Sequence, residues 1–201
     1  MVCFLNVIIC IAVMWSMVLL FYNAGFVHGY MKLSEITMWS FFTVLLSWSI
    51  YIQDCEISVS VIAVSYLVVS AYIDSKTRDV YTFFSMTAAV CVMIAVFIKV
   101  YPQWNNVLYI TAISVYLKIL EKSGAYGGGD TDYMLVVHLL YMYMYDEASY
   151  DITIFTLIMS LLVHYICYSD MKREKYPLTP CILAVVITIF IIKGKMFNGF
   201  I

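Results

Sequence analysis

The sequence predicts an all-α protein, a polytopic transmembrane helix bundle of about eight helices with no soluble domain. Hydrophobic residues make up 64% of the 201 positions and charged residues only 12%, whereas soluble domains are roughly 45–50% apolar and about 25% charged. With a mean hydropathy of +0.93, this composition excludes a water-soluble fold. The apolar runs are continuous, which excludes a membrane β-barrel, because barrel strands alternate apolar and polar residues.

Eight charge-poor stretches define the predicted helices, since a bilayer core about 30 Å thick needs roughly 20 apolar residues per crossing. The fifth stretch is short and the third is borderline, so a seven-helix bundle remains an alternative. The first stretch is not predicted to be a cleaved signal, because no basic residue precedes it and its apolar run is longer than the roughly 7–15 residues of a signal peptide. In chain order the predicted spans are 2–22, 36–52, 57–73, 80–98, 107–120, 125–145, 152–169 and 177–192.

The connections between these spans are too short to fold as a separate soluble domain. We therefore predict one continuous membrane domain, with two N-terminal transmembrane helices in residues 1–56 and a six-helix core in residues 57–201. The lipid bilayer is the first predicted partner. A net charge of −2 gives no reason to expect nucleic acid.

The basic residues predict the orientation of the bundle, because Lys and Arg concentrate in cytoplasmic loops. The opposite face holds only Lys99, Lys193 and Lys195. The basic residues that follow odd-numbered spans are Lys32, Lys76, Arg78, Lys118, Lys122, Lys172, Arg173 and Lys175. Both termini are therefore predicted to lie outside the cell membrane, and the predicted cytoplasmic loops are 23–35, 74–79, 121–126 and 170–176.

Six cysteines are present, and they show no C-x-x-C pairing. All but Cys55 lie in predicted spans, which is typical of small buried apolar residues. We predict neither a metal site nor a disulfide framework, and no cofactor.

Ionisable residues in membrane helices are costly and are functional candidates by default. Four aspartates, Asp74, Asp130, Asp132 and Asp170, lie at or near predicted cytoplasmic ends of spans and therefore at one membrane depth. If the third and sixth spans pack together, Asp74 and Asp130 can face each other across a water. Two such carboxyls share one proton, so the charged member takes a proton from water while the protonated member polarises a scissile carbonyl.

Gly127, Gly128 and Gly129 come directly before Asp130. Each glycine in a helix costs about 1 kcal/mol relative to alanine, so three in a row need a reason. At the edge of the bilayer they let the backbone open and let another extended backbone approach the carboxylate. Cleavage of a peptide needs both features.

Three segments of the chain resemble segments of one protein family. Gly127-Gly128-Gly129-Asp130 fits the G-x-G-D signature of intramembrane aspartyl proteases. Asp74-Ser75-Lys76-Thr77-Arg78-Asp79-Val80 resembles the D-x-K-T-R-x-[IV]-P stretch of type IV prepilin and preflagellin peptidases, with Tyr81 in place of the proline. Tyr176-Pro177-Leu178-Thr179-Pro180 resembles the I-P-x-x-P segment that opens the last helix of those peptidases. The resemblance covers roughly residues 57–192, in the order of the family.

The resemblance implies a membrane-embedded aspartyl endopeptidase that removes the short basic leader from type IV pilin-like or flagellin-like precursors at the cytoplasmic face. It implies that Asp74 and Asp130 are the catalytic pair. Gly127 to Gly129 are then expected to shape a strand-accepting cleft, and Pro177 and Pro180 to border it.

Two comparisons within this protease class narrow the expectation. The larger bacterial members carry a cysteine-bearing loop between their first two helices and methylate the new amino terminus. Here loop 23–35 has no cysteine and no glycine-rich nucleotide cradle, so we predict no methyltransferase activity and no S-adenosylmethionine binding. Presenilin-type proteases share G-x-G-D but place a tyrosine directly before the first aspartate, where this chain has Ile73.

Other ionisable residues receive other predicted roles. Asp170 is the chief rival to Asp74, because it also ends a span beside basic residues. Asp132 follows Asp130 by two residues, a turn of about 200° around a helix, so both cannot face one partner. His138 and His164 are expected to make helix-packing hydrogen bonds.

A non-enzymatic transporter or channel is the alternative class of protein. In such a protein, glycine-interrupted helices and intramembrane acids bind a cation. That interpretation predicts a partner acid deeper in the bilayer, and the sequence shows none.

Overall fold

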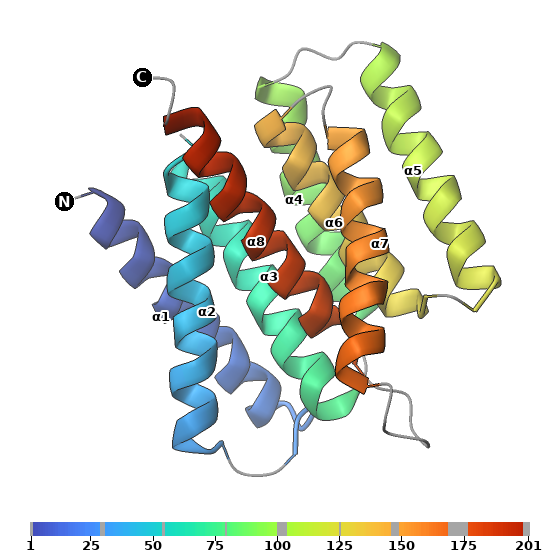
Figure 1. Ribbon diagram of the computed structural model, residues 1–201. Helices are drawn as coiled ribbons and strands as arrows, with labels where there is room; N and C mark the ends of the chain where they lie inside the picture. Colours follow the sequence, from blue (N-terminus) through green and yellow to red (C-terminus); the bar gives the residue numbers. More distant parts are fainter. Residues whose placement is uncertain are drawn as a thin grey trace.

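The computed structural model describes residues 2–28, 31–53, 55–78, 80–99, 104–124, 126–145, 149–168 and 177–198, which form eight α-helices and no strand (Figure 1). The predicted all-α class is confirmed for these ranges, and the helix count agrees with the prediction. The helices are α1 (Val2–Asn23), α2 (Leu33–Tyr51), α3 (Ile57–Thr77), α4 (Thr82–Lys99), α5 (Trp104–Lys122), α6 (Gly128–Tyr145), α7 (Ser149–Tyr168) and α8 (Thr179–Asn198).

Successive helices run in opposite directions along the bundle. The start of α1 and the end of α8 therefore lie towards the same end, at the top of Figure 1. The end of α3 and the starts of α6 and α8 lie at the opposite end. This arrangement brings the three segments that resemble peptidase segments to one end of the molecule.

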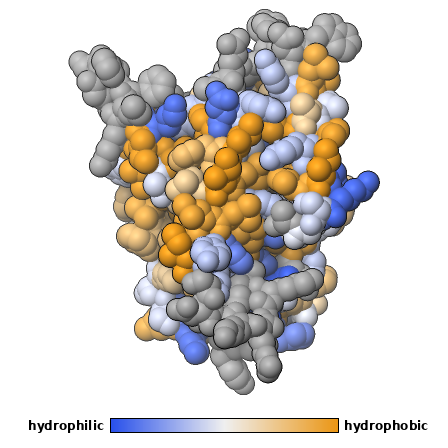
Figure 2. Space-filling view, turned by 45° about the vertical axis from the view of Figure 1, so that its right-hand side comes forward, coloured by the Kyte–Doolittle hydropathy of each residue, from blue (hydrophilic) through white to orange (hydrophobic). Residues whose placement is uncertain are grey.

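The outer surface is strongly apolar. Phe83 is 84% exposed, Ile98 77% and Phe4 72%. In the space-filling view, hydrophobic side chains cover the middle of the visible face, and most hydrophilic side chains lie near its upper and lower ends (Figure 2). Soluble monomers rarely expose such large contiguous apolar areas. Among the described residues, five helices are long and apolar enough to cross a membrane, namely α1, α2, α3, α4 and α7. The side on which the termini lie stays a prediction.

Helix α3 is the centre of the bundle. It packs against α1, α2, α4 and α8 and also contacts α6. Its residues from Ala63 to Asp74 are all buried, so the helix is enclosed on every face. Tyrosines fix its neighbours, because Tyr66 donates a 2.8 Å hydrogen bond to Ser85 of α4, and Tyr133 of α6 donates a 3.0 Å hydrogen bond to the carbonyl of Leu67.

Helix α3 is longer than predicted. The sequence predicts a span that ends at residue 73 and a loop over 74–79, whereas the helix continues to Thr77. The Thr77 hydroxyl donates a hydrogen bond to the carbonyl of Ile73, one turn earlier, so this polar side chain has a partner within the helix. Arg78 ends the helix with a left-handed backbone (φ 61°), and its N–H bonds the carbonyl of Asp74. Asp74 therefore lies inside the last turn of a helix, on a rigid element.

The two N-terminal helices share the core of the bundle. The Tyr22 hydroxyl of α1 lies 2.8 Å from that of Tyr72 in α3, and Trp39 of α2 meets the Tyr72 ring edge-on with centroids 5.6 Å apart. Tyr81, which replaces the proline of the resembled family, stacks on Phe21 at 5.6 Å between centroids. Residues 1–56 thus contribute side chains that contact the helix carrying Asp74.

Candidate active site

Asp74 is held at the end of α3 by the start of α8. Only 5% of its surface is exposed. Its Oδ2 accepts a 3.1 Å hydrogen bond from the backbone N–H of Thr179, which comes 105 residues later in the chain. Thr179 is the first residue of α8, and the first N–H groups of a helix have no partner within it. The carboxylate therefore meets a donor that the helix itself leaves available.

Asp130 lies in the first turn of α6. Its Oδ1 accepts a 2.9 Å hydrogen bond from the Thr179 hydroxyl, and its Oδ2 accepts a 3.3 Å bond from the N–H of Gly127. The second bond resembles the reaching-back contact of a capping box, in which a side chain in the first turn bonds the N–H just before the helix. The start of a helix also favours negative charge. These contacts fix the direction in which the Asp130 carboxylate points.

Thr179 joins the two aspartates. Its N–H bonds Asp74 and its hydroxyl bonds Asp130, so carboxylates from two different helices converge on one fully buried residue. The sequence predicts one membrane depth for the two acids but predicts no role for Thr179. The feature that could have indicated this residue is a hydroxyl at the start of the last predicted span, at the same depth as the acids.

Gly129 has a steric role that involves the chain itself. A Cβ at Gly129 would lie 2.6 Å from the Cβ of Val80, far inside van der Waals contact. Val80 belongs to the segment that follows Asp74. At Gly129, the protein's own chain therefore occupies the space next to the backbone that was expected to admit a substrate. A Cβ at Gly128 would lie 3.2 Å from a carboxylate oxygen of Glu121, which is a looser contact than at Gly129. A Cβ at Gly127 would lie 3.0 Å from a carboxylate oxygen of Asp130.

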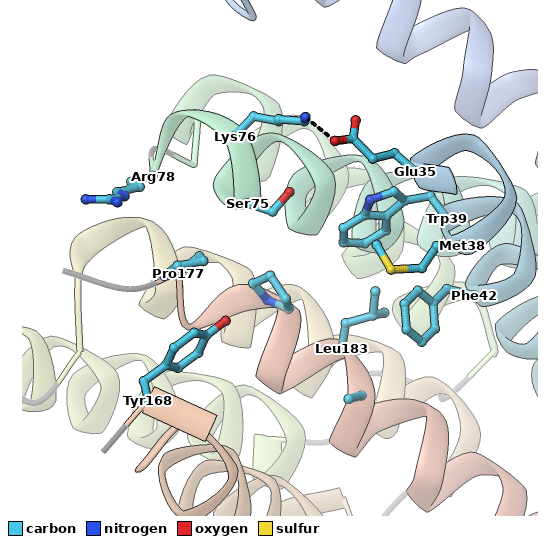
Figure 3. Close-up of a pocket in the computed structure, with 12 residues that line it drawn as sticks. Glu35, Met38, Trp39, Phe42, Ser75, Lys76, Arg78, Tyr168, Pro177 and Leu183 are labelled. Carbon is cyan, nitrogen blue, oxygen red and sulfur yellow. Dashed lines mark hydrogen bonds and ion pairs between the residues drawn. The ribbon is translucent and has the colours of Figure 1, made fainter. Parts of the chain in front are cut away.

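A groove of about 500 Å³ opens beside the end of α3, between α2, α3 and α8 (Figure 3). We call it the α2–α8 groove. The predicted cleft residues Pro177 and Pro180 both line it. At its outer edge Lys76 and Glu35 form an ion pair of 2.6 Å, which ties α3 to α2. The full lining is Glu35, Met38, Trp39, Phe42, Ser75, Lys76, Arg78, Tyr168, Pro177, Pro180, Leu183 and Ala184.

Asp132 faces a different part of the molecule. It lines a second cavity of about 360 Å³ together with Gly128, Gly129 and residues of α4 and α5. Its Oδ1 lies 4.0 Å from Lys118, which also forms a 2.6 Å ion pair with Glu121. The hydrogen bond from Lys118 lowers the pKa of Glu121, which lies beyond the predicted fifth span.

The cavity and the Lys118 contact place Asp132 on another side of α6 than Asp130, as a separation of two helical residues predicts.

The two histidines have different surroundings. His138 is fully buried, and its Nδ1 lies 2.8 Å from the Thr153 hydroxyl of α7, which is the predicted kind of helix-packing bond. His164 packs against Tyr168 of its own helix at 5.0 Å between centroids.

Several predicted features fall outside the described residues. These are Asp170, the rival to Asp74, and the loop 170–176 with Tyr176. Within the described ranges, no group of three or more His, Cys, Asp or Glu side chains is arranged to hold a metal ion.

Comparison of the chain with known protein families, with curated proteins and with solved structures gives no match. The fold and the site define a class of protein, a helical bundle compatible with a membrane that carries two carboxylates joined through one threonine. The relation to prepilin and preflagellin peptidases stays a prediction from the three segments.

Proposed function

We propose that the chain is a membrane-embedded aspartyl endopeptidase that removes the leader from type IV pilin-like or flagellin-like precursors, with Asp74 and Asp130 as its working pair. The supporting observation is that both carboxylates bond Thr179. Two carboxylates from separate helices that bond the same residue support the proposal that they act as a pair.

The proposed chemistry requires the two carboxyl groups to lie close together. In that arrangement both cannot ionise easily, so they share a proton. The charged member takes a proton from water, whose oxygen attacks the scissile carbonyl, while the protonated member donates a hydrogen bond to that carbonyl oxygen. The C–N bond then breaks, and the leaving nitrogen takes a proton from the pair. Thr179 keeps the two carboxyls near each other by donating to each.

The test is cleavage by the purified protein of a leader-bearing pilin precursor in lipid vesicles, with the products identified by mass spectrometry. Asp74→Ala and Asp130→Ala are each expected to lower the rate by at least about 10²-fold, because a positioned acid or base contributes about 10²–10⁴-fold. Asp132→Ala is the matched control, since it removes a carboxylate from the same helix on a different side. Asp170→Ala tests the rival acid. The last two variants should keep the parental rate within about threefold, and cleavage by Asp130→Ala would end the assignment.

A cation transporter or channel is the alternative class. It needs an acid deeper in the bilayer, whereas the acids among the described residues lie near helix ends or in connections. Vesicles loaded with a Na⁺-sensitive dye separate the two classes. The peptidase proposal expects no Na⁺ flux beyond that of empty vesicles, and a flux that Asp130→Ala abolishes would favour the transporter.

A further inference from the structure

The α2–α8 groove has an apolar wall and a charged mouth. Met38, Trp39 and Phe42 of α2 face Leu183 of α8 across the groove in Figure 3. Glu35, Lys76 and Arg78 lie at its outer edge, where the Lys76–Glu35 ion pair also lies. The charged edge can bind polar groups or water, and the apolar wall can bind apolar side chains.

The groove is lined by sequence neighbours of the aspartate pair and of Thr179. Ser75, which directly follows Asp74, lines it. Pro177 and Pro180 line it as well, and in the chain they lie on either side of Thr179, the residue that both carboxylates bond. The groove therefore borders the end of α3 and the start of α8, the two segments that bring Asp74 to Thr179.

The α2 side of the groove is a fixed wall. Trp39 is buried and packs edge-on against Tyr72 of α3, two residues before Asp74, and its ring centroid lies 5.7 Å from that of Phe42. On the other side, Ala184 of α8 is exposed and small. The groove is therefore lined by large rings on α2 and by a small residue on α8.

We propose that the α2–α8 groove binds the apolar side chain of the substrate polypeptide next to the cleaved bond, and that Phe42 and Ala184 determine the size it accepts. The inference rests on the proposed peptidase function and goes beyond it, because it gives the second N-terminal helix a part in substrate selection. A polypeptide is the occupant that fits, since the groove borders the segments that hold the proposed catalytic pair and has a charged edge and an apolar wall. Its volume of about 500 Å³ is in the range of binding pockets, roughly 300–1,000 Å³.

The experiment uses pilin precursors that differ only at the residue directly before or directly after the cleaved bond, with Ala, Leu, Phe or Trp at that position. Phe42→Ala widens the groove and is expected to raise the ratio of Trp to Ala substrate cleavage about tenfold at one of the two positions. Ala184→Phe narrows it and is expected to lower the same ratio about tenfold, because such pocket changes discriminate by about 10- to 200-fold. Ala184→Leu is the milder variant if Ala184→Phe does not fold.

Phe41→Ala is the matched control. Phe41 is the neighbour of Phe42 on α2, is 60% exposed and does not line the groove, so its loss should leave the ratio unchanged. A parent protein that cleaves no precursor overturns the peptidase function, and the inference falls with it. A parent that cleaves, with ratios that the groove variants do not alter, overturns the inference alone.

A bound phospholipid is the competing occupant. Native mass spectrometry of the parent and of Phe42→Ala, both extracted from phosphatidylethanolamine and phosphatidylglycerol vesicles, tests it. Loss of a retained phospholipid in the variant, with unchanged substrate ratios, would assign the groove to lipid and overturn the inference. Equal lipid retention with altered ratios supports the substrate site.

Discussion

Thr179→Val removes the hydroxyl that donates to Asp130 and keeps the backbone N–H that donates to Asp74. Valine is similar in size and also β-branched, so the start of α8 should be preserved. A hydrogen bond to a charged group contributes about 1.5–3 kcal/mol. If the bond contributes fully to the transition state, its loss lowers kcat/KM roughly 10- to 150-fold. Most of the effect should fall on kcat, because Thr179 acts through the carboxylate and not through substrate binding.

The assay is cleavage of the leader-bearing precursor over a range of substrate concentrations. Thr179→Ser keeps the hydroxyl and should stay within about threefold of the parent. Thr188→Val makes the same chemical change about two and a half turns further along α8, on the other side of the helix. There the hydroxyl bonds only the carbonyl of Ala184 among the described contacts. Equal activity of Thr179→Val and Thr188→Val would refute the idea that Thr179 organises the pair.

Three further outcomes are expected. Gly129→Ala places a Cβ against the Cβ of Val80 and should destabilise the protein by about 1–3 kcal/mol and lower activity. Adding Val80→Gly removes the opposing Cβ and should restore part of both, whereas Val80→Ala keeps it and should restore less, as measured by thermal unfolding in detergent and by cleavage. Thr153→Val removes the buried partner of His138 and should lower the unfolding free energy by about 1–3 kcal/mol with little change in kcat. Glu35→Gln removes the charge from a partly exposed ion pair at the groove edge and should change the unfolding free energy by no more than about 1 kcal/mol.

The helices could be predicted from the sequence because the signal is local. The length of each apolar run is determined by the thickness of the bilayer and does not depend on which helices pack beside it. The end of α3 could not be predicted in this way. Charges from Asp74 to Arg78 mark where a chain leaves the bilayer, but a helix continues as long as its backbone bonds continue, here to Thr77. The prediction therefore places Asp74 after the helix when it lies within its last turn.

For the site, the sequence predicts the depth of each residue in the membrane but not its lateral position. Membrane depth follows from position along each span, so the sequence brings Asp74 and Asp130 to one level. Their lateral positions depend on contacts between residues 105 and 49 positions apart, which leave no periodic or local pattern. Thr179 and the Gly129–Val80 contact were missed for this reason. The resemblance supplied the segments but not the residue that joins them.

The two carboxylates of the proposed pair both meet the N-terminal end of a helix. Asp130 is in the first turn of α6, and it accepts bonds from the N–H of Gly127 and the hydroxyl of Thr179. Asp74 is in the last turn of α3, but its Oδ2 accepts the N–H of Thr179, the first residue of α8. The N–H groups at a helix start favour a negative charge. Each member of the proposed pair therefore has a helix start that can stabilise its charged form, which suits a pair in which either member can carry the shared proton.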